Sequence, residues 1–233
     1  MNIQTNTNQP ILIILIRLLD MDPSTQWWLD AVDCLKQSKL QYTRFATGFF
    51  MDYWGMPHVK SNLAPFTFSI DMQNGQAAIP GDGNVPLSLT YSRDLARFVV
   101  RTLDLDEWPE FSIGVGDDLT FNQMVRLAEE VRGKLVGSSH LIRYDKLILV
   151  LGKKFQVTYD SVEKVNEGDV TMLPIPKGAP FSEDEMKEYN ALFGQLTLRG
   201  AFHVPTENRL NSKFPDLVPL NFQQFLDEAW RGR

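Results

Sequence analysis

The stretch LKQSKLQYTRFATGFFMDYWGM, residues 35–56, decides the fold class of this chain. It reads as the end of an amphipathic helix, then a strand of β-branched and aromatic residues from Gln41 to Phe45, then a loop of glycine and aromatic side chains. A helix that leads into such a strand is typical of the crossover connections between parallel strands. The stretch therefore predicts an α/β protein in which Gln41–Phe45 is a strand of a parallel sheet.

Hydrophobic periodicity predicts further strands along the chain. They are expected at the alternating or β-branched segments Phe66–Ile70, Ala77–Ile79, Val85–Leu89, Phe111–Val115 and Gln156–Tyr159. Asn74 and Gly75, which separate the first two segments, predict a two-residue hairpin turn. Strands mixed with helical crossovers favour an α/β fold over a helical bundle or a β-sandwich.

Four more helices are expected, each from its first residues or from an apolar stripe. We expect Ser92 to cap the first, Thr120 and Gln123 the second, Ser182 and Glu185 the third, which ends near Gly194, and Asn221 the last. The inward faces are expected to hold Leu95, Phe98, Val99 and Leu103 in the first helix, Phe121, Met124, Val125, Ala128 and Val131 in the second, and Phe222, Phe225, Leu226, Ala229 and Trp230 in the last.

Several motifs follow one another in an order that is typical of one family. They are Tyr42-Thr43-Arg44-Phe45, Gly48-Phe49-Phe50-Met51-Asp52-Tyr53, Pro80-Gly81-Asp82-Gly83 and Ser92-Arg93-Asp94-Leu95-Ala96-Arg97-Phe98-Val99, followed by Phe155–Lys164 and Leu210–Trp230. Together they resemble the NmrA-like family, fungal relatives of the isoflavone-reductase group of atypical short-chain dehydrogenases. The resemblance covers most of residues 29–230.

The resemblance implies the C-terminal part of a Rossmann-like parallel sheet with a smaller α+β subdomain on the substrate side. Residues 29–233 would form this NmrA-like domain, after an atypical N-terminal segment at residues 1–28. The Gly-rich first turn of such a sheet lies well upstream of the Tyr-Thr strand, so we expect an N-terminally truncated fungal member. Residues 135–151 interrupt the family's order between two Gly-Lys pairs, and we interpret them as an insertion.

The composition is that of a soluble globular protein of one domain or one and a half. The chain has 233 residues, 43% hydrophobic content and a formal charge of −6. It has no cluster of lysine and arginine, so we expect no direct binding of nucleic acid. Cys34 is the single cysteine, which excludes an internal disulfide and a cysteine-based metal site and suits a cytoplasmic protein.

Ile11–Leu19 is the most apolar run of the chain. Its nine residues, which include Arg17, are too few to span a bilayer, so we expect no membrane segment there. The run is interpreted as a buried strand or a short helix. A third interpretation is an unnatural start produced by gene truncation or mis-splicing.

Two glycine pairs look like the start of a dinucleotide-binding turn but lack its third glycine. Gly81-Asp82-Gly83 and Gly114-Val115-Gly116 would need that glycine at Pro86 and Leu119. The second pair is also followed by two aspartates, which would repel a pyrophosphate. We therefore expect turns and caps at both places.

The position of a catalytic lysine is taken by a tryptophan. Active relatives of the resembled family carry a lysine on the helix before the Tyr-Thr strand, and the family's spacing places Trp28 there. An indole carries no charge and exchanges no proton at neutral pH. Lys36, the nearest lysine, is expected to be a solvated surface residue, so no catalytic or cofactor-binding residue is assigned.

Neither the histidines nor the acidic run at residues 183–185 predicts a site. His58, His140 and His203 have no acidic or cysteine partner at ligand spacing, so we expect no metal site. The acidic run stands at an expected helix start, where negative charge is stabilised by the helix macrodipole.

The loop after the Tyr-Thr strand is the candidate substrate pocket. In the resembling enzymes this loop covers the substrate beside the nicotinamide, which here implies Ala46, Thr47, Gly48, Phe49, Phe50 and Tyr53. Apolar and aromatic groups of this kind suit a flat, poorly soluble metabolite. The competing interpretation is that Phe49 and Phe50 join the core to a lid.

For function, the resemblance implies an NAD(P)H-dependent oxidoreductase that acts on a small organic metabolite in fungal secondary metabolism. Its cofactor would be NADP or NAD, and the protein would contribute orientation and a dry pocket. A hypothesis of a different class is a catalytically inactive regulator that senses dinucleotides or binds a protein partner. A third is a truncated, non-functional remnant. An unpaired sheet edge also predicts a homodimer.

Overall fold

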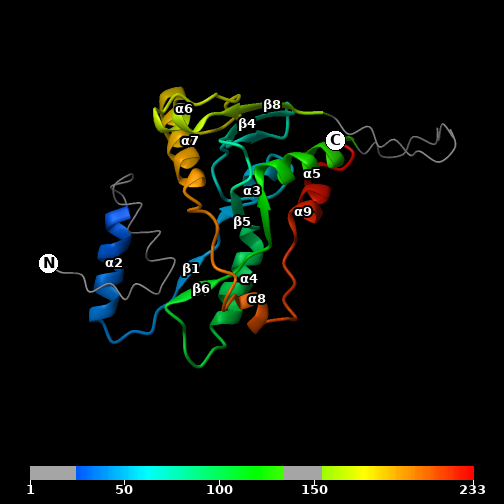
Figure 1. Ribbon diagram of the computed structural model, residues 1–233. Helices are drawn as coiled ribbons and strands as arrows, with labels where there is room; N and C mark the ends of the chain where they lie inside the picture. The colour runs from blue at the N-terminus through cyan, green and yellow to red at the C-terminus, as the bar shows by residue number, and fades with distance from the viewer. Residues whose placement is uncertain (1–24, 134–153) are drawn as a thin grey trace.

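The computed structural model of the chain describes residues 25–133 and 154–233. The helices are α2 (Thr25–Gln37), α3 (Asp52–Gly55), α4 (Ser92–Thr102), α5 (Phe121–Gly133), α6 (Val162–Asn166), α7 (Glu183–Leu198), α8 (Leu210–Lys213) and α9 (Phe222–Trp230). The strands are β1 (Arg44–Ala46), β2 (Phe49–Phe50), β3 (Ile70–Asp71), β4 (Gln76–Pro80), β5 (Pro86–Thr90), β6 (Phe111–Ile113), β7 (Asp117–Thr120) and β8 (Gln156–Asp160). Figure 1 shows these elements grouped around central strands, with α2 to one side.

The described strands form three short sheets, and each sheet contains one parallel pair. β1 runs parallel to β6. β5 lies between β2, its parallel partner, and β7, its antiparallel partner. β4 likewise lies between the antiparallel β3 and the parallel β8. Mixed helices and parallel strands confirm the expected α/β class.

The strand predicted at Gln41–Phe45 is parallel, as expected, but it lies further along the chain. β1 begins at Arg44 and ends at Ala46, so residues 41–43 are outside any strand. The ladder to β6 starts where Arg44 stands opposite Phe111, and the preceding residues have no partner in that ladder. The residue types therefore predicted the strand, and pairing with β6 determines the residue at which it begins.

The strand predicted at Phe66–Ile70 is wrong in extent but right in its alternation. Phe66, Phe68 and Ile70 are all buried, yet the strand β3 starts only at Ile70. Ser69 has φ of +56°, which interrupts an extended backbone. Alternating burial here does not need a paired strand.

The hairpin predicted at Asn74-Gly75 is present, but its loop has four residues instead of two. Asp71 pairs with Gln76, which leaves residues 72–75 as the turn. The Asp71 carboxylate accepts hydrogen bonds from the N–H groups of Gln73 and Asn74, both at 2.9 Å. An aspartate that bonds the backbone two and three residues ahead favours this longer turn.

Ser92 does not cap α4, as the sequence had predicted, but is its first residue. The Ncap residue is Tyr91, whose side chain makes no capping hydrogen bond. The buried carboxylate of Asp52 accepts hydrogen bonds from Ser92 N at 3.0 Å and Ser92 Oγ at 2.6 Å. A distant aspartate thus satisfies a donor that the first turn leaves free.

The inward face of α4 is narrower than predicted. Phe98 is fully buried, and Leu95 and Val99 are half-buried. Leu103 was also expected to face inward, but it lies past Thr102, the last helical residue, and is 62% exposed. The apolar period continued in the sequence beyond the point where the helix ends.

Helices α5 and α9 agree with their predictions. The Thr120–Gln123 capping box is formed, with Thr120 N donating to Gln123 Oε1 at 2.8 Å. Asn221 caps α9 and accepts a hydrogen bond from Gln224 N at 2.8 Å. Every residue predicted on the two inward faces is buried. Each such Leu or Phe contributes about 1.5–3 kcal/mol by leaving water.

Helix α7 begins with the predicted capping box of Ser182 and Glu185 but ends at Leu198, four residues after the expected end. Gly194 lies inside the helix, where Val165 of α6 packs against it: a Cβ at Gly194 would stand 3.0 Å from Val165 Cγ1. The positive φ of +71° that ends the helical path occurs at Gly200. Close packing, not a helix end, explains Gly194.

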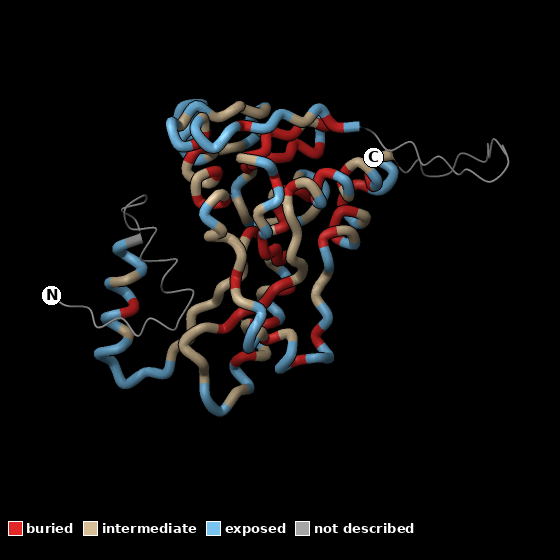
Figure 2. Tube along the Cα trace, viewed as in Figure 1, coloured by how far each residue is buried: buried red, intermediate tan, exposed pale blue. Residues whose placement is uncertain are grey.

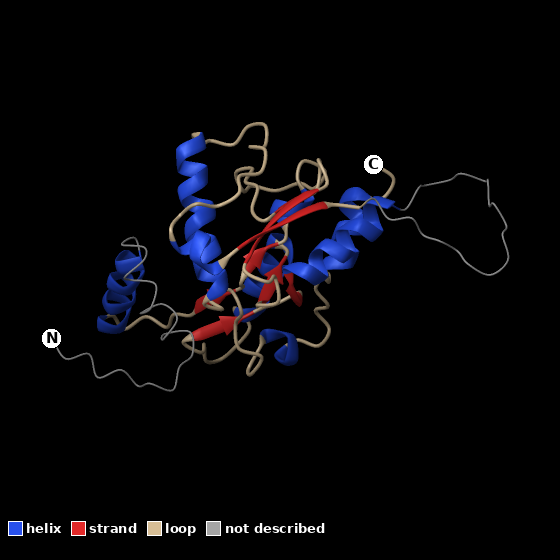
Figure 3. Cartoon of the chain, turned by 45° about the horizontal axis from the view of Figure 1, so that its top comes forward, coloured by secondary structure: helices blue, strands red, loops and turns tan. Residues whose placement is uncertain are grey.

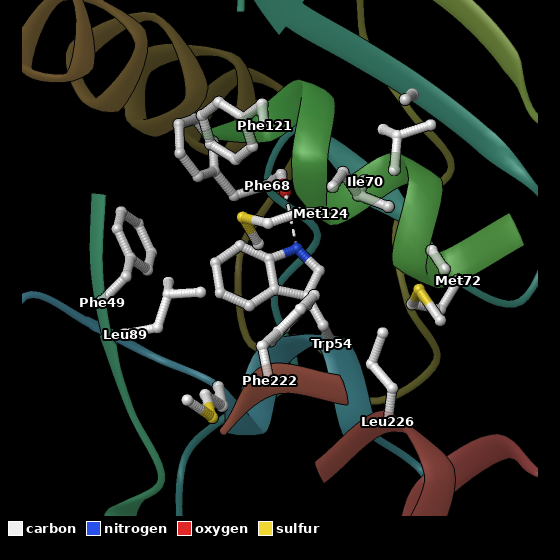
Figure 4. Packing of buried hydrophobic residues seen from close by; sticks show 14 of the residues in the cluster. Phe49, Trp54, Phe68, Ile70, Met72, Leu89, Phe121, Met124, Phe222 and Leu226 are labelled. Atoms are coloured by element: carbon white, nitrogen blue, oxygen red, sulfur yellow. Dashed lines mark hydrogen bonds between the residues drawn. The ribbon is translucent and has the colours of Figure 1, made fainter. Parts of the chain in front are cut away.

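The main core gathers aromatic side chains from β2, α3, α5 and α9 around Trp54 (Figure 4). Trp54 is 1% exposed, and its Nε1 donates to Phe68 O at 3.2 Å. Trp230 Nε1 in turn donates to Trp54 O at 2.7 Å. Both indole N–H groups of this core are therefore satisfied, as buried polar groups require.

Helix α2 is the least covered helix of the described chain. Val32 is its one buried residue in the range 26–37, while Trp27 is 75% and Trp28 70% exposed (Figure 2). It lies at one end of the molecule in both views (Figure 1, Figure 3). Its start at Thr25 falls within the segment 1–28 expected to be atypical. The Ile11–Leu19 run and the insertion predicted at residues 135–151 lie outside the described residues.

Candidate functional site

The six residues expected to line one substrate pocket lie in four different places. Ala46, Thr47 and Gly48 line one cavity, and Tyr53 lines another. Phe49 is buried in the main core, whereas Phe50, beside it on β2, is half-buried and lines neither cavity. Successive side chains of a strand point to opposite faces, so a contiguous stretch does not all face one pocket.

The first cavity, here called the strand-edge cavity, has a volume of about 550 Å³. It is lined by Trp28, Ala31, Val32, Leu35, Thr43, Arg44, Phe45, Ala46, Thr47, Gly48, Phe111, Ala201, Phe202 and Val204. The four α2 residues are spaced by three and four and so share one side of that helix. Six consecutive residues of the β1 segment form the facing wall. β1 pairs with β6 on one edge, and on its other edge it pairs with no strand of the described chain.

The strand-edge cavity extends past the carboxyl end of β1. Ligands of α/β proteins bind beside the carboxyl ends of parallel strands. Gly48 permits the chain to leave β1 there, because it has φ of +68° and a Cβ would stand only 2.0 Å from Ser88 O of β5. A glycine is therefore required for β2 to approach β5 beside the cavity.

Phe49 separates the strand-edge cavity from the cavity that contains Tyr53. Its ring centroid lies 4.5 Å from that of Phe202, a wall of the first cavity, and 6.1 Å from that of Tyr53. It also stacks on Phe68 at 5.1 Å. Figure 4 shows Phe49 pointing into the core beside Leu89. Phe49 is therefore a member of the main core and lines neither cavity.

The polar groups on the cavity wall are only partly engaged, since Nε and Nη1 of Arg44 are buried and have no hydrogen-bond partner among the described residues. Thr43 Oγ1 and Ser112 Oγ share a hydrogen bond of 2.8 Å. Arg44 forms an ion pair with Glu110 and lies 3.9 Å from the centre of the Phe111 ring. Hydroxyl and guanidinium groups hold their protons at neutral pH. The described wall can therefore bind and orient an apolar body, but it offers no general acid or base.

A polar cluster that sequence reasoning missed holds the third wall of this cavity. Arg209 Nη1 donates to Asp118 Oδ2 at 2.6 Å, and Ser88 Oγ donates to Asp118 Oδ1 at 2.6 Å. Ser88 N donates to Phe202 O at 2.9 Å, and Val204 N donates to Ser88 Oγ at 3.1 Å. These bonds fix the segment that carries Phe202 and Val204.

Asp118 is ionised in this cluster. Burial raises the pKa of Asp118, but hydrogen bonds from Arg209 and Ser88 outweigh burial and bring the pKa below its usual range. The sequence showed Asp118 only as one of two aspartates after a glycine pair. Arg209 comes from 91 residues further along the chain, so no local signal connected the two.

The residue at the family's lysine position is on the wall of the strand-edge cavity. Trp28 lines it from α2, while Lys36 is exposed and does not line it. The prediction that Lys36 is a solvated surface residue is therefore confirmed. An indole in this wall supplies a flat apolar surface in place of a charge.

The glycine pairs do not fit a dinucleotide, because atoms of the chain fill the space beside them. A Cβ at Gly114 would stand 2.8 Å from the Phe98 ring, and one at Gly116 would stand 2.5 Å from Leu220 O. The Gly81–Gly83 turn packs in the same way against Leu198 and Asn122. Asp117 Oδ2 accepts a hydrogen bond from Phe222 N and so helps to start α9. These glycines serve packing, and neither pair leaves room for a pyrophosphate.

The second cavity, here called the proline cavity, has a volume of about 630 Å³. It is bounded by Tyr53, the loop at residues 56–67, the β3–β4 hairpin at residues 70–74 and the segment at residues 174–177. Four of its lining residues are prolines: Pro57, Pro65, Pro174 and Pro176.

No group of three metal-binding side chains lies together within residues 25–133 and 154–233. His58 packs edge-on against Trp230, and burial, then Arg233 and Arg132, lower its pKa. His203 Nε2 stands 3.8 Å from Asp118 Oδ1. His140 lies outside the described residues. None of the helices in the described part of the chain is long and apolar enough to cross a membrane.

The relatives of the chain are fungal proteins named as oxidoreductases. It is 29% identical over 209 residues to oxidoreductase swnN of Arthroderma benhamiae, covering 85% of the chain and 64% of the relative. With swnN of Metarhizium robertsii the identity is 28%, over 90% and 58% of the two chains. With oxidoreductase BOA1 of Botryotinia fuckeliana it is 38%, over 48% and 37%. The chain thus spans about six tenths of the length of the swnN relatives. No family model matches it.

Solved structures agree on the fold. AtPrR2 in its apo form superposes with a TM-score of 0.54 at 16% identity, over 88% of this chain and 60% of that one. A nucleoside-diphosphate-sugar epimerase from Staphylococcus aureus superposes with a TM-score of 0.52 at 18% identity, over 87% and 58%. The fold is Rossmann-like. At these identities the similarity concerns the fold alone.

Proposed function

We propose that this chain is the substrate-binding part of an NmrA-like, NAD(P)H-dependent oxidoreductase. Its substrate would be a small, mostly apolar organic metabolite of fungal secondary metabolism, and its location the cytoplasm. The fungal relatives named as oxidoreductases and the Rossmann-like fold support the proposal. The observation that carries it is the apolar strand-edge cavity beside the carboxyl end of β1.

Within this function the chain would bind and orient the metabolite. Trp28 and Phe202 present flat apolar surfaces to the strand-edge cavity, and Leu35 adds an aliphatic one. A ring held against such surfaces loses its contact with water, which contributes about 25 cal/mol for each Å² buried. Because the glycine turns are filled, we route no chemical step through a dinucleotide held by the described residues.

Titration with acetylnaphthalene, a flat neutral ketone, tests the cavity through tryptophan fluorescence, because Trp28 is in its wall. We expect saturable quenching with a Kd on the order of 100 µM, as is usual for a ligand of this size. Ala31→Trp fills the cavity from α2 and should abolish the part of the quenching that comes from Trp28. Asp33→Trp places the same side chain on the same helix outside the cavity, and it should leave binding intact. Unchanged quenching in Ala31→Trp would exclude the cavity.

Titration with NADPH tests the assigned role. The glycine turns leave no room for a pyrophosphate, so we expect no saturable NADPH binding below about 1 mM and no NADPH oxidation by this chain. A micromolar Kd for NADPH would contradict the restriction to substrate binding.

The second candidate function is a catalytically inactive regulator that binds a small molecule or a protein partner. The lack of a general acid or base in the described cavity wall favours it. In either case we propose a homodimer formed through the second edge of β1, because an unpaired edge binds another strand. Sedimentation velocity at rising concentration checks this, and a monomer at every concentration would contradict it.

A further inference from the structure

The proline cavity is a second hollow of the molecule, with walls that the backbone itself makes stiff. Proline fixes its own φ, and prolines come from two separate segments, Pro57 and Pro65 from the first loop and Pro174 and Pro176 from the later one. A ligand that enters such a cavity loses little affinity to ordering of the walls. The cavity is therefore already formed for a rigid ligand.

Part of its polar lining is committed to the fold, while Thr67 and Lys177 also line the cavity. Ser61 Oγ donates to Asp52 Oδ1 at 2.7 Å, and the Asp71 carboxylate accepts hydrogen bonds from the turn residues Gln73 and Asn74. The hydroxyl of Tyr53 differs, because no residue in the described chain forms a hydrogen bond with it. The hydroxyl of a tyrosine whose ring is packed into the protein usually has a hydrogen-bond partner.

The ring of Tyr53 is nevertheless held firmly. It packs edge-on against Phe49, with centroids 6.1 Å apart, and against Phe66 at 6.0 Å. Burial and the charge of Asp52 raise its pKa, so the hydroxyl keeps its proton at neutral pH and remains a donor. The cavity thus combines apolar surfaces with a donor, the Tyr53 hydroxyl, that is held in place.

We propose that the proline cavity is a binding site of its own, for a flat apolar molecule that carries a carbonyl oxygen, with the Tyr53 hydroxyl donating to that oxygen. The apolar part of the walls comes from prolines and from side chains such as Met56, Ile70 and Met72, and Lys177 adds a charged donor that also suits an oxygen acceptor. A donor held at one point of a cavity fixes the orientation of such a ligand.

This site is separate from the strand-edge cavity. Phe49 stands between them and contacts Phe202 on one side and Tyr53 on the other. The inference therefore goes beyond the proposed function: either cavity can bind its ligand if the other does not.

The probe for the test is prodan, a flat naphthalene ketone whose emission moves to shorter wavelength in apolar surroundings. We expect saturable binding to the whole chain. Tyr53→Phe keeps the ring contacts and removes the donor, and it should raise the Kd about 5-fold, the loss expected for one hydrogen bond. Tyr189→Phe is the matched control, since Tyr189 packs against Phe66 from outside the cavity, and its Kd should not change.

Two cavity-filling variants complete the test. Because the strand-edge cavity accepts a similar flat ketone, the prodan titrations are made in the Ala31→Trp background, in which that cavity is filled. In this background, Leu63→Trp, which fills the proline cavity, should abolish saturable binding. The proposal is overturned if the chain binds no prodan, if Tyr53→Phe and Tyr189→Phe behave alike, or if Ala31→Trp removes the binding. If Leu63→Trp fails to fold, as judged by circular dichroism, the comparison of the two tyrosine variants decides.

Discussion

Helices α9 and α2 carry similar apolar patterns, yet they end in opposite surroundings. On α9, Phe222, Phe225 and Trp230 are at most 2% exposed, because α3 and α5 lie against that face. On α2, the tryptophans at 27 and 28 are at least 70% exposed, and Val32 is the one buried residue among those whose burial is described (Figure 2). An amphipathic pattern thus predicts a helix, while burial depends on what stands opposite its apolar face.

The difference in stability should be largest when a tryptophan of the main core and a tryptophan of α2 are each replaced by alanine. Trp54→Ala opens a cavity in the core and leaves Phe222 and Phe49 without part of their packing, so we expect a loss of about 3–5 kcal/mol in the free energy of unfolding. Trp27→Ala removes an exposed ring and should change that free energy by less than about 0.5 kcal/mol. Urea unfolding followed by circular dichroism measures both. Equal losses would show that α2 is as well packed as the core.

Next in size is the contact that starts α4. Asp52→Ala removes the acceptor of Ser92 N, Ser92 Oγ and Ser61 Oγ in a buried place, and we expect a loss of about 2 kcal/mol. Ser61→Ala removes one of these bonds and should lose about 1 kcal/mol or less. Both values come from the same unfolding curves. If the serine variant loses as much as the aspartate variant, Asp52 does not cap the helix.

Sequence reasoning succeeded where the signal was local and failed where the partner was distant. The capping boxes at Thr120 and Ser182 join residues three apart, and both are formed. The cap of α4 comes from Asp52, 40 residues earlier, and the ion pair of Asp118 from Arg209, 91 residues later. No period or spacing in the chain encodes such pairs.

The candidate pocket shows the same limit. The loop after the Tyr-Thr strand does border cavities, as the resemblance implied, and Thr47 and Tyr53 both line one. The division into two cavities depends on Phe49, whose contacts with Phe68, Phe193 and Phe202 come from three later segments. A contiguous stretch of sequence gives the neighbourhood of a site, and tertiary packing decides which side chains share it.

A smaller loss of stability is expected at the Asp118 cluster, which holds the wall of the strand-edge cavity that carries Phe202 and Val204. Asp118→Asn loses the charge-assisted bonds to Arg209 and should lower the free energy of unfolding at pH 7 by about 1 kcal/mol. The folded pKa of Asp118 is depressed, so its contribution is complete above the unfolded pKa of about 3.9 and is lost as pH falls through the lower folded pKa.

The matching measurement is the free energy of unfolding of both proteins between pH 7 and pH 3. The difference between wild type and Asp118→Asn should stay constant down to about pH 5 and shrink below about pH 4. A difference that grows as the pH falls would contradict the depressed pKa.

The smallest effect on stability should come from Trp28→Ala. This variant distinguishes a role in folding from a role in ligand binding. Trp28→Ala removes a ring that is 70% exposed, so the free energy of unfolding should change by less than about 0.5 kcal/mol. The same ring lines the strand-edge cavity. Its loss should raise the Kd of a flat ligand in that cavity several-fold, since stacking on an aromatic face contributes about 0.5–1.5 kcal/mol. Trp27→Ala is the control one position away, because Trp27 is equally exposed but does not line the cavity. Equilibrium dialysis with acetylnaphthalene measures the affinity without relying on the tryptophan signal. If both variants bind it as wild type does, the exposed face of α2 is not part of a binding site.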